Sequence, residues 1–166
     1  MSVIRPATAS DIPVILQMIH ELAEYEKEPD AVRNTPEMLG EALFGKNPSV
    51  FAHLAENLAG EVQGFALWFL NYSTWEGVHG IYLEDLYVVP GARGEGHGKA
   101  LLQHLAATAV ERGYARVEWS VLDWNEPSIN FYRSLGAEPM DGWSTFRLTG
   151  DALGAFGTTS KVLTHG

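Results

Sequence analysis

The feature that most constrains this chain is a glycine-rich loop between a predicted strand and a predicted helix. Residues 88–102 read VVPGARGEGHGKALL, in which four glycines follow Pro90 within eight residues before an amphipathic pattern resumes. Glycine takes positive φ values at little cost, so such a loop aims several backbone amides and the positive end of a helix dipole at one point. The spacing predicts a binding site for a pyrophosphate group.

Two common phosphate-binding loops do not fit this spacing. The phosphate loop of nucleotide hydrolases needs glycine where Arg93 stands, and Ala100 lacks the hydroxyl that would bind magnesium. The dinucleotide fingerprint needs glycine where Lys99 stands, and it is expected after the first strand of a domain, whereas several strands precede this loop. The loop therefore belongs to another class.

The apolar spacing along the chain predicts an α/β fold with one mixed sheet and helices packed on it. The expected order is β-α-α-β-β-β-α-β-α-β, with the two later helices as crossover connections. We expect one domain over residues 1–166, with a frayed tail from residue 150. The expected strands span residues 3–7, 49–56, 61–72, 80–89, 115–122 and 143–148, and the expected helices span residues 10–25, 36–44, 98–112 and 125–135.

Composition excludes several classes of function. Twenty-one acidic against eleven basic residues give a formal net charge of -10, which repels nucleic acid phosphates. The absence of cysteine excludes disulfides, thiolate metal sites and a cysteine nucleophile. The six histidines show no ligand spacing with carboxylates, so we expect no metal site. Neither a membrane span nor a signal peptide is predicted, and a cytoplasmic location is expected.

The hexamer Arg93-Gly94-Glu95-Gly96-His97-Gly98 resembles the Arg/Gln-x-x-Gly-x-Gly/Ala motif of the GNAT superfamily of N-acetyltransferases. The strand YLEDLYV before it and DWNEPSINFYRSLGA after it fit the same pattern. With IRPAT, ELAEYEK, YSTWEG and DGW, these segments are similar to the diamine (spermidine/spermine) acetyltransferase family over nearly the whole chain. STWEG and VLDWN resemble its thialysine acetyltransferase branch, EPSINFY resembles the polyamine branch, and Ser73 replaces an acidic residue of the polyamine enzymes.

This resemblance implies a GNAT fold with a mostly antiparallel sheet, a homodimer, and acetyl-CoA as cofactor. It implies direct acetyl transfer to the primary amine of a small molecule in a ternary complex. The ring of His97, or only its backbone amide, is expected to face the pyrophosphate, while a helix cap alone would explain Asn125. The implied cofactor-binding residues are Leu86, Tyr87, Val88, Arg93, Gly94, Glu95, Gly96, His97, Gly98, Lys99, Asn125, Ser128 and Tyr132.

The chemistry of amine acetylation explains the remaining candidates. An alkyl ammonium with a pKa near ~10.4 must lose a proton before it can attack, so a base is needed. The resemblance assigns this role to Glu84, and it makes Tyr132 the proton donor to the leaving thiolate. A regular strand would send Glu84 and Asp85 to opposite faces, unless a bulge brings them together. The implied substrate-binding residues are Tyr25, Glu26, Trp75, Glu84, Asp85 and Asp141.

Simpler interpretations remain open for several of these residues. Tyr132 also has the helical spacing of a core aromatic, Asp85 also suits a charge at a sheet edge, and Trp75 also suits a core or dimer contact. The substrate is either a polyamine or a lysine-like amino acid such as thialysine. Two other functions share the cofactor half of such a fold: an acetyltransferase of protein N-termini, and a non-catalytic module that binds acetyl-CoA.

Overall fold

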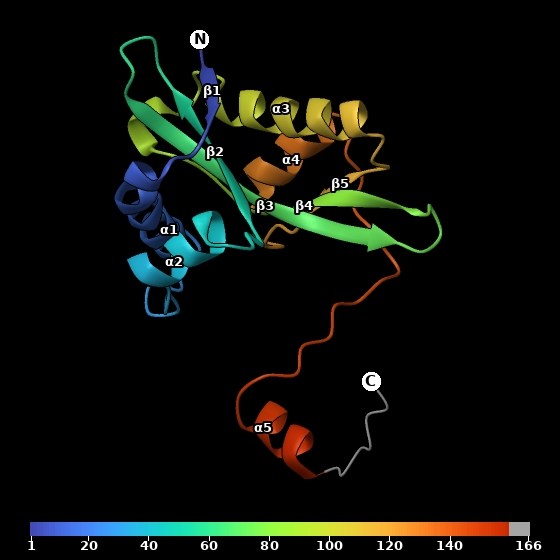
Figure 1. The fold of residues 1–166 in the computed structure, drawn as a ribbon. Helices are drawn as coiled ribbons and strands as arrows, with labels where there is room; N and C mark the ends of the chain where they lie inside the picture. The colour runs from blue at the N-terminus through green and yellow to red at the C-terminus, as the bar shows by residue number, and fades with distance from the viewer. Residues whose placement is uncertain (160–166) are drawn as a thin grey trace. The chain divides into compact units, whose positions relative to one another are not determined.

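Five strands pair in the order β1-β2-β3-β4-β5 to form one sheet (Figure 1). The pairs from β1 to β4 are antiparallel, and β5 runs parallel to β4. The mixed, mostly antiparallel sheet expected from the sequence is therefore confirmed. The strands are β1 (Val3–Pro6), β2 (Phe51–Glu56), β3 (Val62–Ser73), β4 (Val78–Val88) and β5 (Val117–Trp119).

Three α-helices accompany this sheet, and each lies close to where the sequence predicts it. They are α1 (Ile12–Tyr25), α2 (Pro36–Phe44) and α3 (His97–Arg112), with the short 3-10 turns η1 (Ala9–Asp11) and η2 (Pro90–Ala92). Because α3 connects β4 to β5 as a crossover, these two strands can run parallel. Pro36 opens α2 at its first position, where a missing amide hydrogen costs little.

Side chains alternate along each strand, so both faces of the sheet have apolar residues that pack against helices. Leu54 and Phe65 face one side and share a buried cluster with Ile15 and Met18 of α1. On the other side α3 contacts β2, β3 and β4 and buries Leu105 completely. Helices therefore cover both faces of the sheet, and β4 is fixed between them at the strand end that leads into the glycine loop (Figure 1).

The computed structural model describes residues 1–159, and the chain divides into two compact units, Met1–Trp124 and Asn125–Gly166. The sheet, α1, α2 and α3 form the first unit. The second contains α4 (Glu126–Ser134) and α5 (Gly150–Thr159). A single domain over the whole chain stays a prediction. No helix in residues 1–159 is both long and apolar enough to cross a membrane.

The strand predicted at residues 143–148 is wrong. Within residues 1–159 that segment joins no strand ladder, and Trp143 and Phe146 are exposed. A strand exists only where a neighbour accepts its backbone hydrogen bonds, and an apolar run alone does not provide that neighbour. The second predicted crossover is therefore not completed by a strand.

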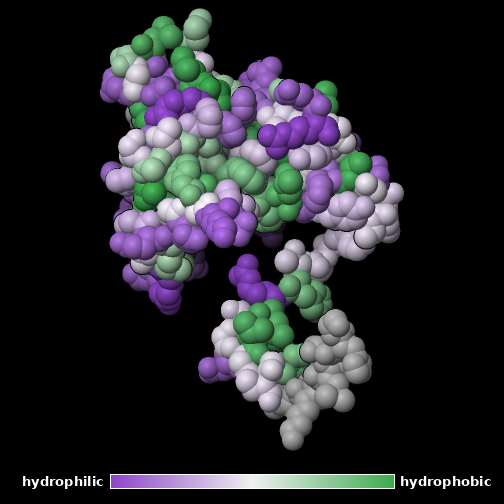
Figure 2. All heavy atoms as spheres, in the orientation of Figure 1, coloured by the Kyte–Doolittle hydropathy of each residue, from purple (hydrophilic) through white to green (hydrophobic). Residues whose placement is uncertain are grey.

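The sequence predicts a frayed tail from residue 150, and part of that tail is helical. Residues 150–159 form α5, where Asp151 lies in the first turn and favours the positive end of the helix dipole. Leu153 and Phe156 are three residues apart and give the helix exposed apolar surface, seen as green atoms in the lower part of Figure 2. The predicted fraying of residues 160–166 lies outside the described residues.

Candidate functional site

The glycine loop has the geometry of an anion-binding turn. After β4 the chain passes through η2, and Gly94 and Gly96 take φ values of 87° and 89° before α3 begins at His97. A Cβ atom placed on either glycine would meet no atom within 4 Å. Glycine is therefore required for the backbone angle, and the space beside the loop is open. A ligand can approach the first amides of α3 there, as a pyrophosphate requires.

Both ring nitrogens of His97 make contacts within the protein, and the ring does not face this space. It is 2% exposed, and its Nδ1 atom lies 2.6 Å from Ser2 Oγ. Its Nε2 atom lies 3.1 Å from a carboxylate oxygen of Glu95. Because a carboxylate can only accept, Nε2 carries the proton in this contact. Of the two roles expected for His97, only the backbone amide remains for an anion, while the ring joins the loop to the segment before β1.

The side chain of Arg93 turns back from the loop toward the end of β4. Its Nε atom donates to the carbonyl oxygen of Val88 at 3.1 Å, and its guanidinium lies 5.2 Å from the ring of Tyr25 and 5.6 Å from that of Tyr87. These contacts tie the loop to α1 and fix where the strand ends. The sequence placed Arg93 in the cofactor loop but did not predict its position between two tyrosine rings.

A bulge in β4 places Glu84 out of register. Leu67 pairs with Asp85 and Trp68 pairs with Leu83, so Glu84 is the extra residue. A bulge breaks the strict alternation of side chains, so the adjacent residues Glu84 and Asp85 need not point to opposite faces of the sheet. Glu84 is exposed and Asp85 is partly buried. The bulge that would let both carboxylates serve one site is therefore present.

Three carboxylates gather at this bulge. Burial, together with the charges of Glu84 and Glu26, raises the pKa of Asp85 to about 6. Burial also raises the pKa of Glu26, with a contribution from Glu84. Glu26 follows the last residue of α1, so the end of that helix and the bulge of β4 place three acidic groups within interaction range. Such a cluster suits an ammonium group, whose positive charge would relieve the repulsion.

Replacing Asp85 by asparagine is expected to stabilise the protein at neutral pH. In the unfolded chain an aspartate ionises near pH ~4, whereas folded Asp85 ionises near 6. The ionised form is therefore disfavoured by folding, and this cost grows between pH ~4 and ~6 and is constant above. The difference corresponds to about 2 to 3 kcal/mol. Urea unfolding should show equal stability for both proteins near pH 4 and a gap that opens by pH 7; a gap independent of pH would contradict the assignment.

The end of α1 contains an unusual residue next to this acidic cluster. The amide of Lys27 donates to Glu24 O at 3.0 Å and that of Glu28 donates to Ala23 O at 2.8 Å, the two bonds of a Schellman motif. Glycine is preferred at the position of Lys27, whose φ is 65°. A left-handed conformation costs a residue with a side chain about 1 to 2 kcal/mol. The backbone of Lys27 at the end of α1 is therefore strained.

Lys27 lies against an aromatic pair. Its Nζ atom is 4.3 Å from the ring centroid of Trp124, and that ring is 6.1 Å from the ring of Tyr25. Both rings are partly exposed. A cation over an exposed ring is stabilised by about 0.5 to 1 kcal/mol, which does not exceed the cost of the backbone conformation. Sequence reasoning missed Lys27 and Trp124, although the lack of a glycine after the first predicted helix was a signal for Lys27.

The end of β4 has an unpaired edge that can face a ligand. The ladders of the described chain pair β5 with β4 only from Ile81 to Leu83. Residues 85–88 pair with β3, but β5 does not cover their other edge. Leu86 and Val88 are partly covered, Tyr87 is buried, and burial raises the pKa of Tyr87. The backbone of the predicted residues 86–88 therefore has an edge available for a ligand.

Trp75 lies far from the three carboxylates along β4. It lies in the turn between β3 and β4 and is 88% exposed. Six residues of extended strand separate Val78 from Glu84, a span of about 20 Å. The exposure of Trp75 also disagrees with a place in the core of the chain.

The remaining predicted residues belong to the loop or to the second unit. Lys99 is exposed in the first turn of α3, and Gly98 is partly covered beside Val88. In the second unit the side chain of Asn125 is buried and accepts a hydrogen bond from the amide of Ser128 at 3.4 Å, so it caps α4. Tyr132 lies on α4, partly buried, with its ring 5.7 Å from that of Phe131. Asp141 is exposed in a turn.

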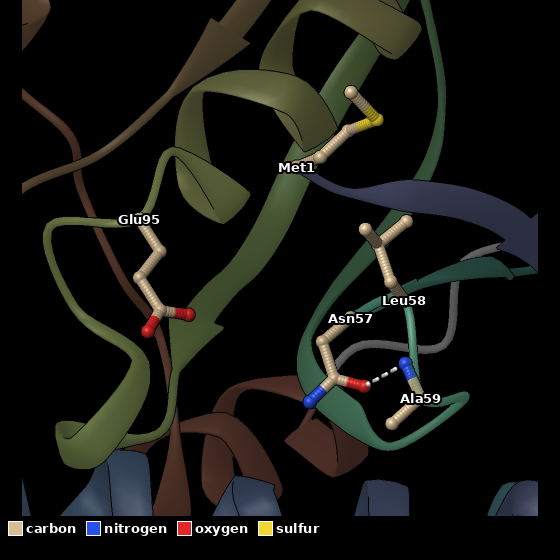
Figure 3. Close-up of a pocket in the computed structure, with 5 residues that line it drawn as sticks. All are labelled: Met1, Asn57, Leu58, Ala59 and Glu95. Carbon is tan, nitrogen blue, oxygen red and sulfur yellow. Dashed lines mark hydrogen bonds between the residues drawn. The ribbon is translucent and has the colours of Figure 1, made fainter.

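A pocket of about 550 Å³ lies beside the glycine loop, where Glu95 lines it. Figure 3 shows Glu95 on one side of it and the turn between β2 and β3 on the other, where Asn57 accepts a hydrogen bond from the amide of Ala59. Met1 and Leu58 complete the lining. None of the three clustered carboxylates lines this pocket, so we assign the site from the loop and the bulge and not from the pocket.

Two histidines form a separate contact on the α3 side of the sheet. His53 Nδ1 accepts a hydrogen bond from Trp68 Nε1 at 3.0 Å, and its ring lies 4.5 Å from that of His104. Burial lowers the pKa of His53 to about 4, with contributions from His104 and Arg112. This ring is therefore neutral at physiological pH, and it packs against the rings of Trp68 and His104. In the described part of the chain no three histidine, aspartate or glutamate residues are grouped to hold a metal ion.

The comparisons with known proteins agree with this geometry. The profile of the acetyltransferase (GNAT) family matches residues 15–137. Thialysine N-epsilon-acetyltransferase from Sus scrofa is 41% identical over 160 residues, covering 90% of this chain and 94% of that protein. L-ornithine N5-acetyltransferase from Arabidopsis thaliana is 33% identical over 196 residues, covering 92% and 86%.

A solved structure shows the same fold. An integron cassette protein from the mobile metagenome of V. cholerae superposes with a TM-score of 0.79 at 24% identity, covering 95% of this chain and 98% of that one. The family profile spans α1 to the end of α4, including the glycine loop and the β4 bulge. The expected fold and enzyme class are confirmed: the chain belongs to the acetyltransferase (GNAT) family and is an N-acetyltransferase.

Proposed function

We propose that this enzyme transfers an acetyl group from acetyl-CoA to the primary amine of a small cationic molecule. The observation that carries the proposal is the gathering of Glu26, Glu84 and Asp85 at the β4 bulge, on the strand that leads into the glycine loop. Carboxylates at this point attract an ammonium group and can accept its proton. The relatives named above act on thialysine and on ornithine, which are small amines of the same chemical class.

The residues of the glycine loop fit acetyl-CoA. Gly94 and Gly96 leave open space beside the loop, and the first amides of α3 point their positive dipole end toward it. The cofactor would supply an acetyl group activated as a thioester. The free edge of β4 at residues 86–88 would hold the acyl end, and a backbone amide there would stabilise an oxyanion.

Glu84 acts on the amine in this proposal. Its carboxylate holds the ammonium and accepts a proton at Oε, directly or through water, which frees the amine lone pair for attack. The charge of Glu84 raises the pKa of both Asp85 and Glu26, so all three carboxylates contribute to the negative potential around Glu84. Tyr25 and Trp124 provide an aromatic wall beside it.

The second unit contains the remaining residues of the proposal. Tyr132 would donate a proton from its hydroxyl to the leaving sulfur, and Asn125 and Ser128 would bind near it, as the family motif implies. The cap that Asn125 makes on α4 fixes the start of the helix that carries Tyr132. Substrate contacts by Asp141 and Trp75 stay predictions.

The proposed function is tested by acetyl-CoA-dependent thiol release from the purified protein. The acceptor panel contains spermidine, spermine, putrescine, ornithine, lysine, thialysine and peptides with free N-termini. Release with a small amine and none with peptides supports the proposal. Release only with peptides would indicate an acetyltransferase of protein termini, and acetyl-CoA binding without release on any acceptor would indicate a non-catalytic module.

We also propose that the enzyme is a homodimer. The exposed rings of Tyr72 and Trp75 at the end of the β3–β4 hairpin support this assignment, because large exposed aromatics mark contact surfaces. Sedimentation velocity on the purified chain would show a single species of twice the chain mass. The cytoplasmic location expected from the sequence stays a prediction.

A further inference from the structure

We infer that the ring of His97 is a positioning residue for acetyl-CoA, because it holds the carboxylate of Glu95 off the backbone amides that the cofactor phosphates would occupy. This inference rests on the proposed function. It adds a reason why an acidic residue can stand in a loop that binds an anion. The contacts that carry it connect the glycine loop to Ser2, in the segment before β1.

The start of α3 is left uncapped by side chains. Thr35 caps α2 and Asn125 caps α4, each by accepting a hydrogen bond from a backbone amide of the first turn. In the described chain no side chain caps α3, whose N-cap residue is Gly96. Amides at a helix N-terminus attract a carboxylate within reach as well as a phosphate. The carboxylate that lies closest along the chain is that of Glu95, directly before Gly96.

Contact with His97 places this carboxylate elsewhere. One oxygen of Glu95 lies 3.1 Å from His97 Nε2, and the side chain lines the pocket opposite the β2–β3 turn (Figure 3). The flanking residues Gly94 and Gly96 have no side chains that could pack and fix residue 95. The side chain of Glu95 is 56% exposed, so without His97 it would have room to turn toward the amides of α3.

The ring of His97 is itself held in place. Its side chain is 1% exposed, and its Nδ1 atom lies 2.6 Å from Ser2 Oγ. A buried ring whose two nitrogens both have partners cannot turn without leaving polar atoms unpaired, which is costly. Ser2 therefore supports, through His97, the position of a charged side chain in the cofactor loop, although Ser2 and His97 are 95 residues apart in the sequence.

Replacing His97 by leucine tests this role, because leucine fills the buried position and cannot hold a carboxylate. The released carboxylate of Glu95 would compete with the phosphates for the amides of α3. Titration calorimetry should therefore show an affinity for acetyl-CoA about 10-fold below that of the wild-type protein. Adding Glu95→Gln to His97→Leu removes the competing charge and should restore most of this affinity. Adding Glu111→Gln, the same charge change at an exposed position of α3, should not restore it.

Ionic strength and a conservative variant give two further readouts. Salt screens the competition between charges, so the ratio of wild-type to His97→Leu affinity should fall toward one as NaCl rises from about 0.05 to 0.5 M. A loss caused by poorer packing of the loop would keep the same ratio. His97→Gln has an amide nitrogen that can donate to Glu95, and its affinity should lie closer to that of the wild-type protein than the affinity of His97→Leu.

Thermal unfolding shows which variants are folded. If His97→Leu does not fold, Ser2→Ala takes its place, because it removes one partner of the ring from a partly exposed position. Its affinity for acetyl-CoA should fall by a few fold, about the effect of losing one hydrogen bond, and Glu95→Gln should again restore it.

The outcomes separate this inference from the proposed function. An unchanged acetyl-CoA affinity in a folded His97→Leu or Ser2→Ala protein, or a loss that Glu95→Gln does not recover, would overturn the role of His97. The proposed function would then still stand on wild-type binding of acetyl-CoA and thiol release with a small amine. Absence of acetyl-CoA binding to the wild-type protein would overturn the proposed function, and the inference with it.

Discussion

Replacing Glu84 by glutamine is expected to lower kcat/KM for the amine acceptor by about 10²- to 10⁴-fold at neutral pH, the range for loss of a general base. Glu84 is the extra residue of the β4 bulge and raises the pKa of both Asp85 and Glu26. Glutamine keeps the shape of the side chain and removes its charge and its ability to accept the proton.

The pH profile of this variant carries more information than its rate at one pH. An amine with a pKa near ~10.4 deprotonates in solution as the pH rises, so the need for a protein base fades. The defect of Glu84→Gln should therefore be largest near pH 6 and should shrink toward pH 10 in thiol-release assays. Glu111→Gln, an equal charge change at an exposed position of α3, is the matched control. A defect of equal size at every pH would indicate a binding role for Glu84 in place of a catalytic one.

Replacing Tyr132 by phenylalanine is expected to lower kcat by about 10²-fold or more while acetyl-CoA affinity stays within about twofold. The substitution removes only the hydroxyl, so the partly buried ring keeps its packing against Phe131 on α4. Steady-state thiol release gives kcat, and titration calorimetry gives the affinity. A core aromatic would show the opposite result, with turnover unchanged.

A second tyrosine provides the control for Tyr132. Tyr114, just after α3, has its ring 6.2 Å from that of His79, and Tyr114→Phe removes the same atom from a residue of the first unit. Its kcat should match that of the wild-type enzyme. If both variants lose activity equally, the loss would reflect general destabilisation, and the assignment of Tyr132 as proton donor would fall.

Much of the fold could be predicted because its signals are local. The helix at residues 36–44 follows from Pro36 at its start and apolar residues at helical spacing, and the structure gives the same bounds. The hairpin of β2 and β3 follows from two runs rich in aromatic and aliphatic residues, at 49–56 and 61–72, that are joined by a short turn. The strand predicted at residues 143–148 is wrong because no strand in the described chain pairs with that segment, although its sequence is equally typical of a strand.

The candidate site also contains features that the sequence predicts and features that it does not. The glycine loop could be predicted because the left-handed angles of Gly94 and Gly96 depend on the residue type itself. The sequence pattern also determined the family, since the motif and its flanking segments lie close together along the chain.

Only the tertiary structure decided how the charged groups of the site act. Burial of Asp85 beside Glu84 and Glu26 sets its pKa, the ring of His97 turns to Ser2 and Glu95, and Lys27 meets Trp124. Each of these involves residues that lie far apart in the sequence and meet only in the fold. Sequence therefore determined the loop and the chemistry available to this enzyme, because backbone preference is local. Packing determined which charges meet, because desolvation and contact depend on neighbours that the order of residues does not specify.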